Sequence, residues 1–251
     1  MKNVFIDIET IASQGGYDSY LEDAKANFKA PSTMTKTKAC ADLGLTGDAA
    51  KYKSKDDAIA EWEKKFAEEK APEVAEFNWR KEALDGAKGE VWSIAWSVDG
   101  EMYQIDRGPL GELKDESKFL ALFYEMLEQQ LTNTHSNNAQ EAMFIGHNVV
   151  FDIKFLLHRS IILGVKPCVS MPFDGYHGRD YYCTSKAWAG VRDRISLDNL
   201  CKALGLSGKG DIDGSKVWDA LVDGRHNDVA EYNIDDVQKV IDAHKKLTFG
   251  E

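Results

Sequence analysis

The chain begins MKNVFIDIETIA, and this apolar run carries two acids, Asp7 and Glu9. A strand covered on both faces of a sheet is a near-continuous apolar run, so residues 3–9 predict a buried core strand. Side chains two positions apart on a strand point to the same face, and the two carboxylates therefore project together. Because a buried carboxylate is costly unless something cancels its charge, either the pair is a local accident at a strand end or it holds a cation.

Length and composition limit the class of protein. A chain of 251 residues, of which 43% are hydrophobic, predicts one large domain or one domain with a sizeable insertion. The four cysteines are scattered without a C-x-x-C pair, which argues against a zinc site or a disulfide framework and favours a reducing, cytoplasmic location. Acids interrupt the N-terminal apolar run and no stretch approaches the ~20 apolar residues of a membrane span, so we expect neither a signal peptide nor a membrane partner.

Strand and helix patterns alternate along most of the chain. Residues 91–97 and 102–105 flank Asp99-Gly100, a dipeptide typical of a tight hairpin turn. The later patterns predict helices at residues 116–131, 151–164, 197–206 and 228–246, and short strands at residues 142–148 and 181–186. This order predicts an α/β fold in which a mixed sheet is flanked by helices.

The segment between the first strand and the hairpin has a different character. It contains a charged helical pattern at residues 56–70, in which Ile59, Trp62 and Phe66 recur at spacings of three and four. About 80 residues is far too long for an ordinary connection. We therefore interpret residues 12–90 as a helical insertion within a single domain that spans residues 1–251.

Two further acidic motifs follow the first. In GHNVVFDIKFL a short strand ends at Gly146 and Asp152 opens a helix, where an aspartate is also common as a cap or dipole partner. In EYNIDDVQKVI, Tyr232 and Asp236 lie four residues apart on a predicted helix and so share a face. We expect this face to lie away from the apolar stripe of the helix, which comprises Ala230, Ile234, Val237 and Ile241. Taken alone, an ordinary helix start or a polar surface explains each motif as well.

The order of the three motifs favours a functional interpretation. D-x-E on the first strand, N-x-x-F-D at a strand-to-helix turn and Y-x-x-x-D on the last helix resemble the DEDD exonuclease superfamily of proofreading domains. One branch of that superfamily has a histidine five residues before the last aspartate. Here Glu231 holds that position and Tyr232 follows it, so the chain resembles the tyrosine branch. The runs SLDNLCKALGL and KGDIDGSKVW are similar to free-standing exonucleases related to the proofreading domain of family B DNA polymerases.

The resemblance implies a fold and a reaction. The fold would be RNase H-like, with a mixed five-stranded sheet flanked by helices and a helical insertion after the first strand. The reaction would be hydrolysis of phosphodiester bonds from the 3′ end of DNA, in replication or repair, with release of nucleoside 5′-monophosphates. Asp7, Glu9, Asp152 and Asp236 would bind two divalent cations, Mg²⁺ or Mn²⁺, which prefer hard oxygen ligands. Tyr232 would complete the catalytic set by orienting the attacking water, because a free phenol with a pKa of about 10 is a poor base.

Three neighbouring residues are predicted to contact the substrate, each with a structural alternative. Thr10 would bond the substrate or merely end the strand, and Asn148 would touch the terminal nucleotide or fix the turn. Phe151 would stack on a base, although core packing explains it better. His147 is a candidate general base, but a single histidine at a strand end more often has a structural role.

The formal net charge of −11 indicates how the substrate is held. It disfavours a long electropositive track, so we expect contacts on a few nucleotides at a single-stranded or frayed DNA 3′ end. With no room for a polymerase domain, a partner DNA polymerase or replication protein would be a separate protein. The insertion begins directly after the first acidic strand, and we expect it to form a wall or lid over the single-stranded end.

Three alternative functions stay open at this stage. A 3′-5′ exoribonuclease would use the same chemistry, and no residue identifiably recognises a 2′-hydroxyl. A phosphatase of the D-x-D-x-T type would explain DIET only if Glu9 replaced an aspartate, and would leave the other motifs unexplained. A catalytically silent nucleic-acid-binding module is disfavoured because all four acids are present.

Overall fold

The computed structural model describes residues 1–132, 141–208 and 212–250. Its residues form two compact units, unit 1 with residues 1–11 and 84–251 and unit 2 with residues 12–83. The second unit lies within the predicted insertion at residues 12–90. Residues 209–211, which belong to the run KGDIDGSKVW, lie outside the described residues.

A five-stranded sheet forms the centre of unit 1, in the order β3-β2-β1-β4-β5. β1 (Lys2–Ile11) pairs antiparallel with β2 (Glu90–Val98), and β2 pairs antiparallel with β3 (Glu101–Asp106). On its other side β1 pairs parallel with β4 (Ala142–Gly146), which pairs parallel with β5 (Tyr181–Cys183). This mixed sheet flanked by helices confirms the predicted fold class and is consistent with an RNase H-like fold.

Asp99 and Gly100 form the two-residue turn between β2 and β3. Both have positive φ angles, 54° and 88°, as a mirror-image type I turn requires at its two central positions. Such a turn matches the right-handed twist of the two strands, which is why Asp-Gly between apolar runs predicts a hairpin. The structure confirms that prediction.

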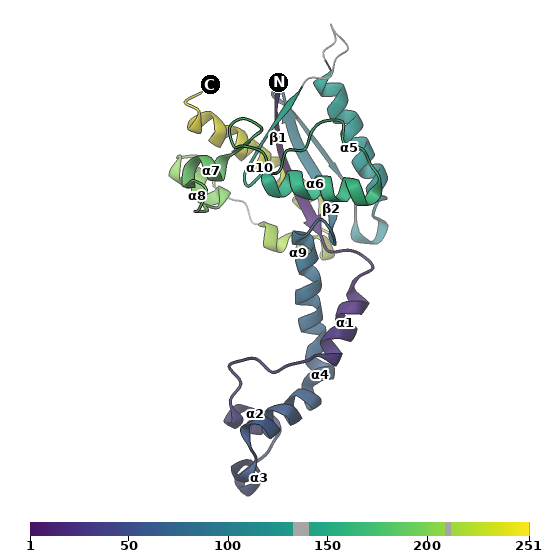
Figure 1. Cartoon of the computed structure of the whole chain (residues 1–251), viewed down its shortest axis with the longest axis vertical. Helices are drawn as coiled ribbons and strands as arrows, with labels where there is room; N and C mark the ends of the chain where they lie inside the picture. The colour runs from purple at the N-terminus through teal and green to yellow at the C-terminus, as the bar shows by residue number, and fades with distance from the viewer. Residues whose placement is uncertain (133–140, 209–211, 251) are drawn as a thin grey trace. The chain divides into compact units, whose positions relative to one another are not determined.

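One face of the sheet packs against α5 (Glu116–Leu131) and α6 (Val150–Leu163), which lie on the same side in Figure 1. Val4, Ile6 and Ile8 of β1 point into this main core. Its largest fully buried side chains are Trp96, Phe123, Phe144 and Phe155. Burial of a large apolar side chain stabilises the fold by about 1.5–3 kcal/mol, so each of these side chains contributes on that scale.

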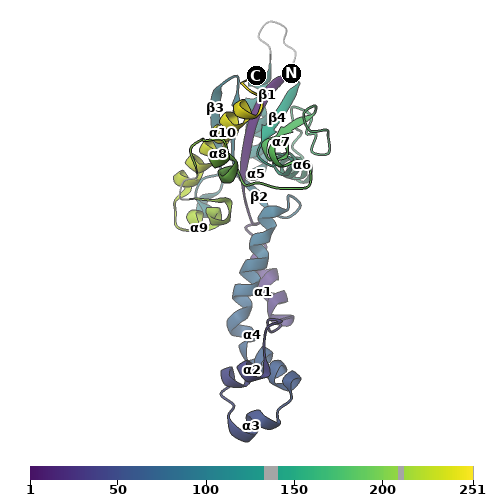
Figure 2. The same cartoon turned by 90° about the vertical axis from the view of Figure 1, so that its left-hand side faces the viewer.

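The opposite face packs against α10 (His226–Leu247), and α9 (Val217–Val222) contacts α10 in turn. Figure 2 shows α10 and α6 on opposite sides of β1. Phe5 of β1 meets the ring of His244 edge to face, with centroids 5.4 Å apart. Ile11 belongs to a second buried cluster, shared with α9. The odd-numbered residues of β1, which include both acids, therefore point toward α10.

The remaining short elements of unit 1 depart most from the predictions. The predicted strand at residues 181–186 ends at Cys183, because its partner β4 ends at Gly146, and α7 (Thr184–Ala189) begins at once. α8 (Leu197–Ala203) ends three residues before the predicted end, and no pattern predicts α9. Leu110–Glu112 and Gly214–Lys216 form short 3₁₀ helices in unit 1, and Lys81–Leu84 forms another at the end of unit 2.

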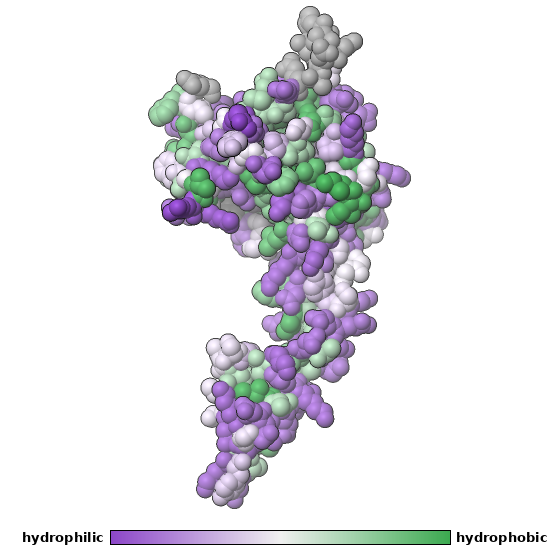
Figure 3. All heavy atoms as spheres, in the orientation of Figure 1, coloured by the Kyte–Doolittle hydropathy of each residue, from purple (hydrophilic) through white to green (hydrophobic). Residues whose placement is uncertain are grey.

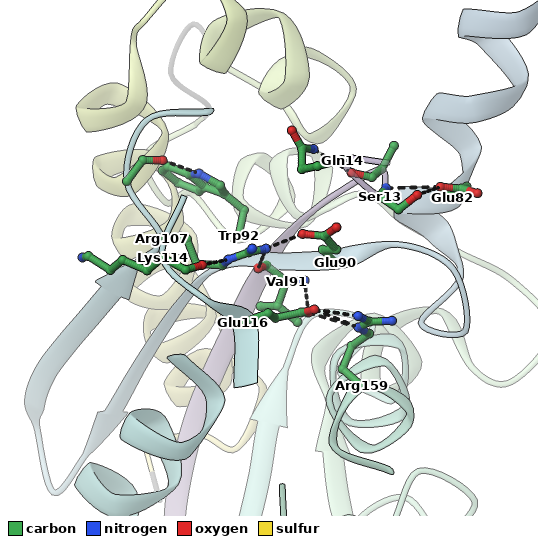
Figure 4. A network of polar contacts seen from close by, with 12 residues as sticks. Ser13, Gln14, Glu82, Glu90, Val91, Trp92, Arg107, Lys114, Glu116 and Arg159 are labelled. Atoms are coloured by element: carbon green, nitrogen blue, oxygen red, sulfur yellow. Dashed lines mark hydrogen bonds and ion pairs between the residues drawn. The ribbon is translucent and has the colours of Figure 1, made fainter. Parts of the chain in front are cut away.

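A buried polar network fixes the start of β2, as Figure 4 shows. Arg107 Nη1 lies 2.6 Å from Glu90 Oε2 and also donates to the carbonyl of Val91. The Val91 N–H donates to Glu116 Oε1 at 2.8 Å, and Arg159 Nη2 donates to Glu116 Oε2 at 2.6 Å. Because an unpaired buried charge is costly, these complete ion pairs hold β2, α5 and α6 together next to the end of β1.

Unit 2 contains α1 (Tyr17–Ala26), α2 (Lys36–Asp42), α3 (Gly47–Tyr52) and α4 (Lys55–Arg80). The predicted helix at residues 56–70 is therefore too short, because α4 continues through Pro72. Pro72 is exposed, so the backbone hydrogen bond that it removes is lost on the solvent side of the helix.

The interior of unit 2 is small and rich in aromatic rings. Trp62 is 3% exposed and stacks on Phe28 with ring centroids 5.9 Å apart. Trp79 Nε1 donates to the carbonyl of Ser13, and Ser13 Oγ donates to Glu82 Oε2 at 2.7 Å, a contact visible in Figure 4. These bonds join the two ends of the unit, where the chain leaves β1 and returns toward β2.

Apolar side chains reach the surface of unit 1 mainly in small groups. Ile161 and Ile162 are exposed near the end of α6, where Figure 3 shows a green patch. Isolated exposed apolar residues are ordinary on protein surfaces.

Within residues 1–132, 141–208 and 212–250, no helix is both long enough and apolar enough to cross a membrane.

Candidate active site

Asp7 and Glu9 lie on β1 where it passes the end of β4. The pairing of β1 with β4 stops at Phe5, so the acids follow directly after the last paired residues of the parallel ladder. Glu9 is 8% exposed and Asp7 is partly exposed. The register of β1 against β2 shifts between Glu9 and Thr10, which marks a β-bulge beside the acids. The sequence prediction that both carboxylates share one face agrees with this geometry.

Asp152 belongs to the first turn of α6, which follows β4 after a tight turn. A Cβ at Gly146 would lie 2.8 Å from the carbonyl oxygen of Ile6, so only glycine lets β4 end this close to β1. Asp152 is 4% exposed, and its Oδ1 accepts a hydrogen bond from the Ile8 N–H at 3.2 Å. Burial raises the pKa of Asp152 to about 7. Asp152, from the second motif, therefore contacts the first motif at Ile8, the residue between Asp7 and Glu9.

Tyr232 and Asp236 lie one turn apart on α10, and the Tyr232 hydroxyl is hydrogen-bonded to the Asp236 carboxylate. Burial, and then the charges of Glu9, Asp236 and Asp7, raise the pKa of Tyr232 far above its usual value. Tyr232 therefore keeps its proton on the phenol oxygen at neutral pH. This agrees with a role in orientation rather than as a base.

Electrostatics shows that the acids from the three motifs are neighbours. The pKa of Asp7 is raised well above its usual value, first by burial and then by the negative charges of Asp152, Glu9 and Asp236. Burial also raises the pKa of Asp236, against the lowering effect of Tyr232 and Lys239. The four predicted acids thus converge from β1, α6 and α10 on one region, at the end of the sheet.

A pocket of about 440 Å³ opens at this region. Its walls come from β1, the turn after β4, the start of α8 and α10, and they include Asp7, His147, Ser196, Asn199, Tyr232, Asp236 and Lys239. Glu9 and Asp152 are buried and are not among its lining residues. The pocket places one candidate ligand from β1 and one from α10 in reach of a bound molecule.

The four acids do not form a ready metal cage. Across the parts of the chain that the structure describes, no group of three or more His, Cys, Asp or Glu side chains has the arrangement of a metal site. Protein donors hold three of the acids instead: Asn233 bonds Asp7, the Ile8 N–H bonds Asp152, and Tyr232 and Lys239 bond Asp236. The donor set still fits hard divalent cations, because crowded carboxylates with raised pKa values are relieved by positive charge.

The structure gives less support to the three predicted substrate contacts. Thr10 is half-buried beside the bulge, and Asn148 is exposed at the turn before α6, where it adopts a left-handed φ of 64°. Phe151 packs against the main core, with its ring 5.6 Å from that of Phe155. None of Thr10, Asn148 and Phe151 lines the 440 Å³ pocket, and their contact with substrate stays a prediction.

His147 has a structural role, as expected for a histidine at this place. Its Nδ1 lies 2.9 Å from Thr184 Oγ1, and its Nε2 lies 2.8 Å from the carbonyl oxygen of Ile195. Burial lowers its pKa, so the ring is neutral at pH 7. Both ring nitrogens are used to hold α7 and the segment before α8, which leaves neither free to take a proton from water.

Two polar residues of α10 escaped the sequence analysis. Asn233 is fully buried, and its Nδ2 donates to Asp7 Oδ2 at 2.7 Å. Lys239 is 6% exposed, and its Nζ lies 2.5 Å from Asp235 Oδ2 and 3.2 Å from Asp236 Oδ1. Of the predicted apolar stripe, Val237 is buried as expected, whereas Ala230, Ile234 and Ile241 are only half-buried. The buried row of α10 contains Val229, Asn233, Val237 and Val240. A polar residue within an apolar row at helical spacing is the signal that would have found Asn233.

Comparison with known families points to a nuclease. Residues 180–241, well under half of the chain, match the model of a family described as a predicted 3′-5′ exonuclease related to the exonuclease domain of PolB. No curated protein matches the chain. The matched segment contains Tyr232 and Asp236 but neither the first motif nor Asp152. The match supports the general exonuclease family, and with it a hydrolytic nuclease.

Proposed function

We propose that the chain is a divalent-metal-dependent 3′-5′ exonuclease that removes nucleotides from single-stranded or frayed DNA 3′ ends and releases nucleoside 5′-monophosphates. The observation that carries the proposal is the convergence of acids from three elements: Asp152 Oδ1 accepts from the Ile8 N–H, between Asp7 and Glu9 on β1, and Asp236 lines one pocket with Asp7. Without bound cations, four neighbouring carboxylates repel one another and destabilise the fold. A site for two divalent cations, by contrast, requires several carboxylates close together.

The four acids and Tyr232 have different roles in this site. Asp7, Glu9, Asp152 and Asp236 would hold two Mg²⁺ or Mn²⁺ ions, which supply Lewis-acid stabilisation of charge on the phosphodiester under attack. Tyr232 keeps its proton and, held by Asp236, presents its hydroxyl to the pocket as a fixed hydrogen-bonding group. Its role is to orient the attacking water.

Lys239 supports Asp236 from the other side. Its ammonium group lies between Asp235 and Asp236 and lines the same pocket. The positive charge lowers the pKa of Asp236 against the effect of burial, and so favours the ionised carboxylate that a cation requires. Asp235, which is exposed, anchors the lysine and is not expected to bind metal.

The choice of substrate rests on size and charge. A pocket of about 440 Å³ is suited to roughly one nucleotide rather than to a duplex, within the usual range for small-molecule sites. The net charge of −11 favours few phosphate contacts, and each contact with a single strand adds only about 0.7 to the salt slope. We therefore expect shallow salt dependence and a preference for unpaired ends.

Digestion of end-labelled oligonucleotides tests the proposal. A 5′-labelled DNA strand should shorten as a ladder with Mg²⁺ or Mn²⁺, whereas a 3′ label should appear at once as mononucleotide. The control is Asp236→Asn, which should be inactive beside an Asp235→Asn protein of nearly wild-type activity, in which Lys239 keeps its ion pair with Asp236. Early release of the 5′ label, cleavage of circular single strands or faster digestion of matching RNA would contradict the direction, the end requirement or the choice of DNA, respectively.

A further inference from the structure

Asn233 joins the two central strands to α10 at the candidate site. Its side chain bonds to residues of both β1 and β2, and it is 0% exposed. Nδ2 donates to Asp7 Oδ2 at 2.7 Å, and Ser93 Oγ, on β2, donates to Asn233 Oδ1 at 2.8 Å. Ser93 is likewise 0% exposed. Three elements distant in sequence thus form one buried hydrogen-bonded chain that ends on a candidate metal ligand.

The Asp7 carboxylate, which only accepts hydrogen bonds, determines which way the amide of Asn233 faces, and the Ser93 hydroxyl holds the amide there. A hydroxyl that donates to the amide oxygen leaves the NH₂ group, which has only donors, to point at Asp7. The reverse amide orientation would place the amide oxygen against the carboxylate of Asp7, with repulsion between two acceptors. The pair Ser93–Asn233 is therefore arranged to give Asp7 a donor and not an acceptor.

The bond to Asn233 limits the motion of the Asp7 carboxylate. A carboxylate is planar, so fixing Oδ2 also fixes the direction of the other oxygen. Without this bond, Asp7 would be free to rotate away from the charges of Asp152, Glu9 and Asp236, which raise its pKa. The donor is neutral, so it restrains the carboxylate without adding a positive charge that would repel a cation.

From this geometry we propose that Asn233 is a positioning residue, whose amide, held by Ser93, keeps Asp7 in the orientation in which Asp7 binds a divalent cation. The inference rests on the proposed function, because it assigns Asp7 to a cation. It predicts that the ligand set depends on two buried polar residues that never touch substrate. Partners that orient a metal ligand typically contribute about 10–100-fold to metal affinity or activity.

Mn²⁺ titration by calorimetry on the full chain, without substrate, tests the inference together with kcat and KM on a single-stranded oligonucleotide. Asn233→Leu should weaken Mn²⁺ binding by about 10–100-fold and lower kcat with little change in KM. Ser93→Ala should give a smaller loss of the same kind. The double variant should be no worse than Asn233→Leu alone, since both residues act through one hydrogen-bonded chain.

Ser97→Ala is the matched control. Ser97 is a buried serine on the same strand, four residues from Ser93 and so on the same face, and its replacement should leave Mn²⁺ binding and turnover unchanged. If Asn233→Leu does not fold, Ser93→Ala decides, beside the side-chain amide NMR signal of Asn233 in the wild type, which should shift on addition of Mg²⁺.

The outcomes separate the inference from the proposed function. A wild type that binds Mn²⁺ and cleaves DNA, beside Asn233 and Ser93 variants that bind Mn²⁺ equally well, would overturn the positioning role and leave the nuclease intact. An equal loss in Ser97→Ala would do the same, because the effect would then be one of packing. A wild type that neither binds Mn²⁺ nor cleaves DNA would overturn both.

Discussion

Asp152 Oδ1 accepts a hydrogen bond from the backbone N–H of Ile8, at 3.2 Å, across 144 residues of chain. β4 pairs with β1 only as far as Phe5. Beyond this parallel ladder, the Asp152 carboxylate, in place of β4, accepts the hydrogen bond from the Ile8 N–H. Asp152 therefore connects the first turn of α6 to the strand that carries the first motif. It is at once a candidate ligand and a part of the framework.

This double role predicts different effects for two substitutions of Asp152. Asp152→Asn keeps an oxygen acceptor for the Ile8 N–H but should lose about 10²-fold or more in activity, because a neutral amide holds a divalent cation poorly. Asp152→Ala should lose the same activity and also about 1–3 kcal/mol of stability relative to Asn, since a buried donor is left unpaired. Urea unfolding in EDTA compares the two, and equal stabilities would show that the hydrogen bond to Ile8 contributes nothing.

Tyr232 is expected to act through its hydroxyl alone. Tyr232→Phe keeps the ring packed against the second buried cluster but removes the group bonded to Asp236. We expect kcat to fall by about 10²-fold while KM stays unchanged, as for a residue that orients water in the transition state. Tyr124→Phe, which removes a buried hydroxyl bonded to Ser160, is the matched control and should turn over normally. Normal turnover in Tyr232→Phe would leave that tyrosine a packing residue.

Local patterns were enough to predict the sheet and its principal helices. Asp99-Gly100 fixed the hairpin because positive φ angles are required there, and the amphipathic repeat from Glu116 to Leu131 gave α5 without error. The acidic motifs marked β1, the start of α6 and α10. These features depend on residues close together in sequence, and that is the information which spacing carries.

The errors in the prediction concern features that depend on residues far apart in sequence. The Y-x-x-x-D motif does not single out Asn233, because its partners Asp7 and Ser93 lie 226 and 140 residues away. A polar residue in the buried row of α10 also hides that row, so the predicted apolar stripe includes only one of its members, Val237. The end of β5 at Cys183 depends in the same way on the length of β4, a strand that the local pattern of residues 181–186 does not contain.

Divalent cations should stabilise the protein. Removing mutual repulsion among the four acids favours the folded state, and binding to the folded form contributes about 2.7 kcal/mol at a hundredfold excess over Kd. Mg²⁺ and Mn²⁺ should therefore raise Tm, and Asp7→Asn should reduce the shift. Ca²⁺ should also raise Tm but support little cleavage, because its looser coordination positions the reacting groups poorly. A Tm that ignores millimolar Mg²⁺ and Mn²⁺ would contradict the site.

His244 should make the stability of unit 1 depend on pH. Its ring lies between Phe5 and Tyr182, with centroids 5.4 and 4.7 Å away, and burial lowers its pKa below the usual 6.5. The unfolded chain then binds the proton first as pH falls, so the contribution of His244 destabilises the folded state below about pH 6.5 and vanishes above it. His244→Phe keeps an aromatic ring but cannot titrate.

The difference in Tm between His244→Phe and the wild type isolates this contribution. Both proteins share every other titrating group, including the acids of the candidate site, whose raised pKa values act in the opposite direction. In EDTA, the difference should be constant above pH 7 and should grow in favour of His244→Phe as pH falls from 6.5 to 5.5, because only the wild type loses stability through this ring. Thermal melts in a series of buffers measure it, and a difference that stays constant across this range would show that His244 titrates alike in the folded and unfolded chain.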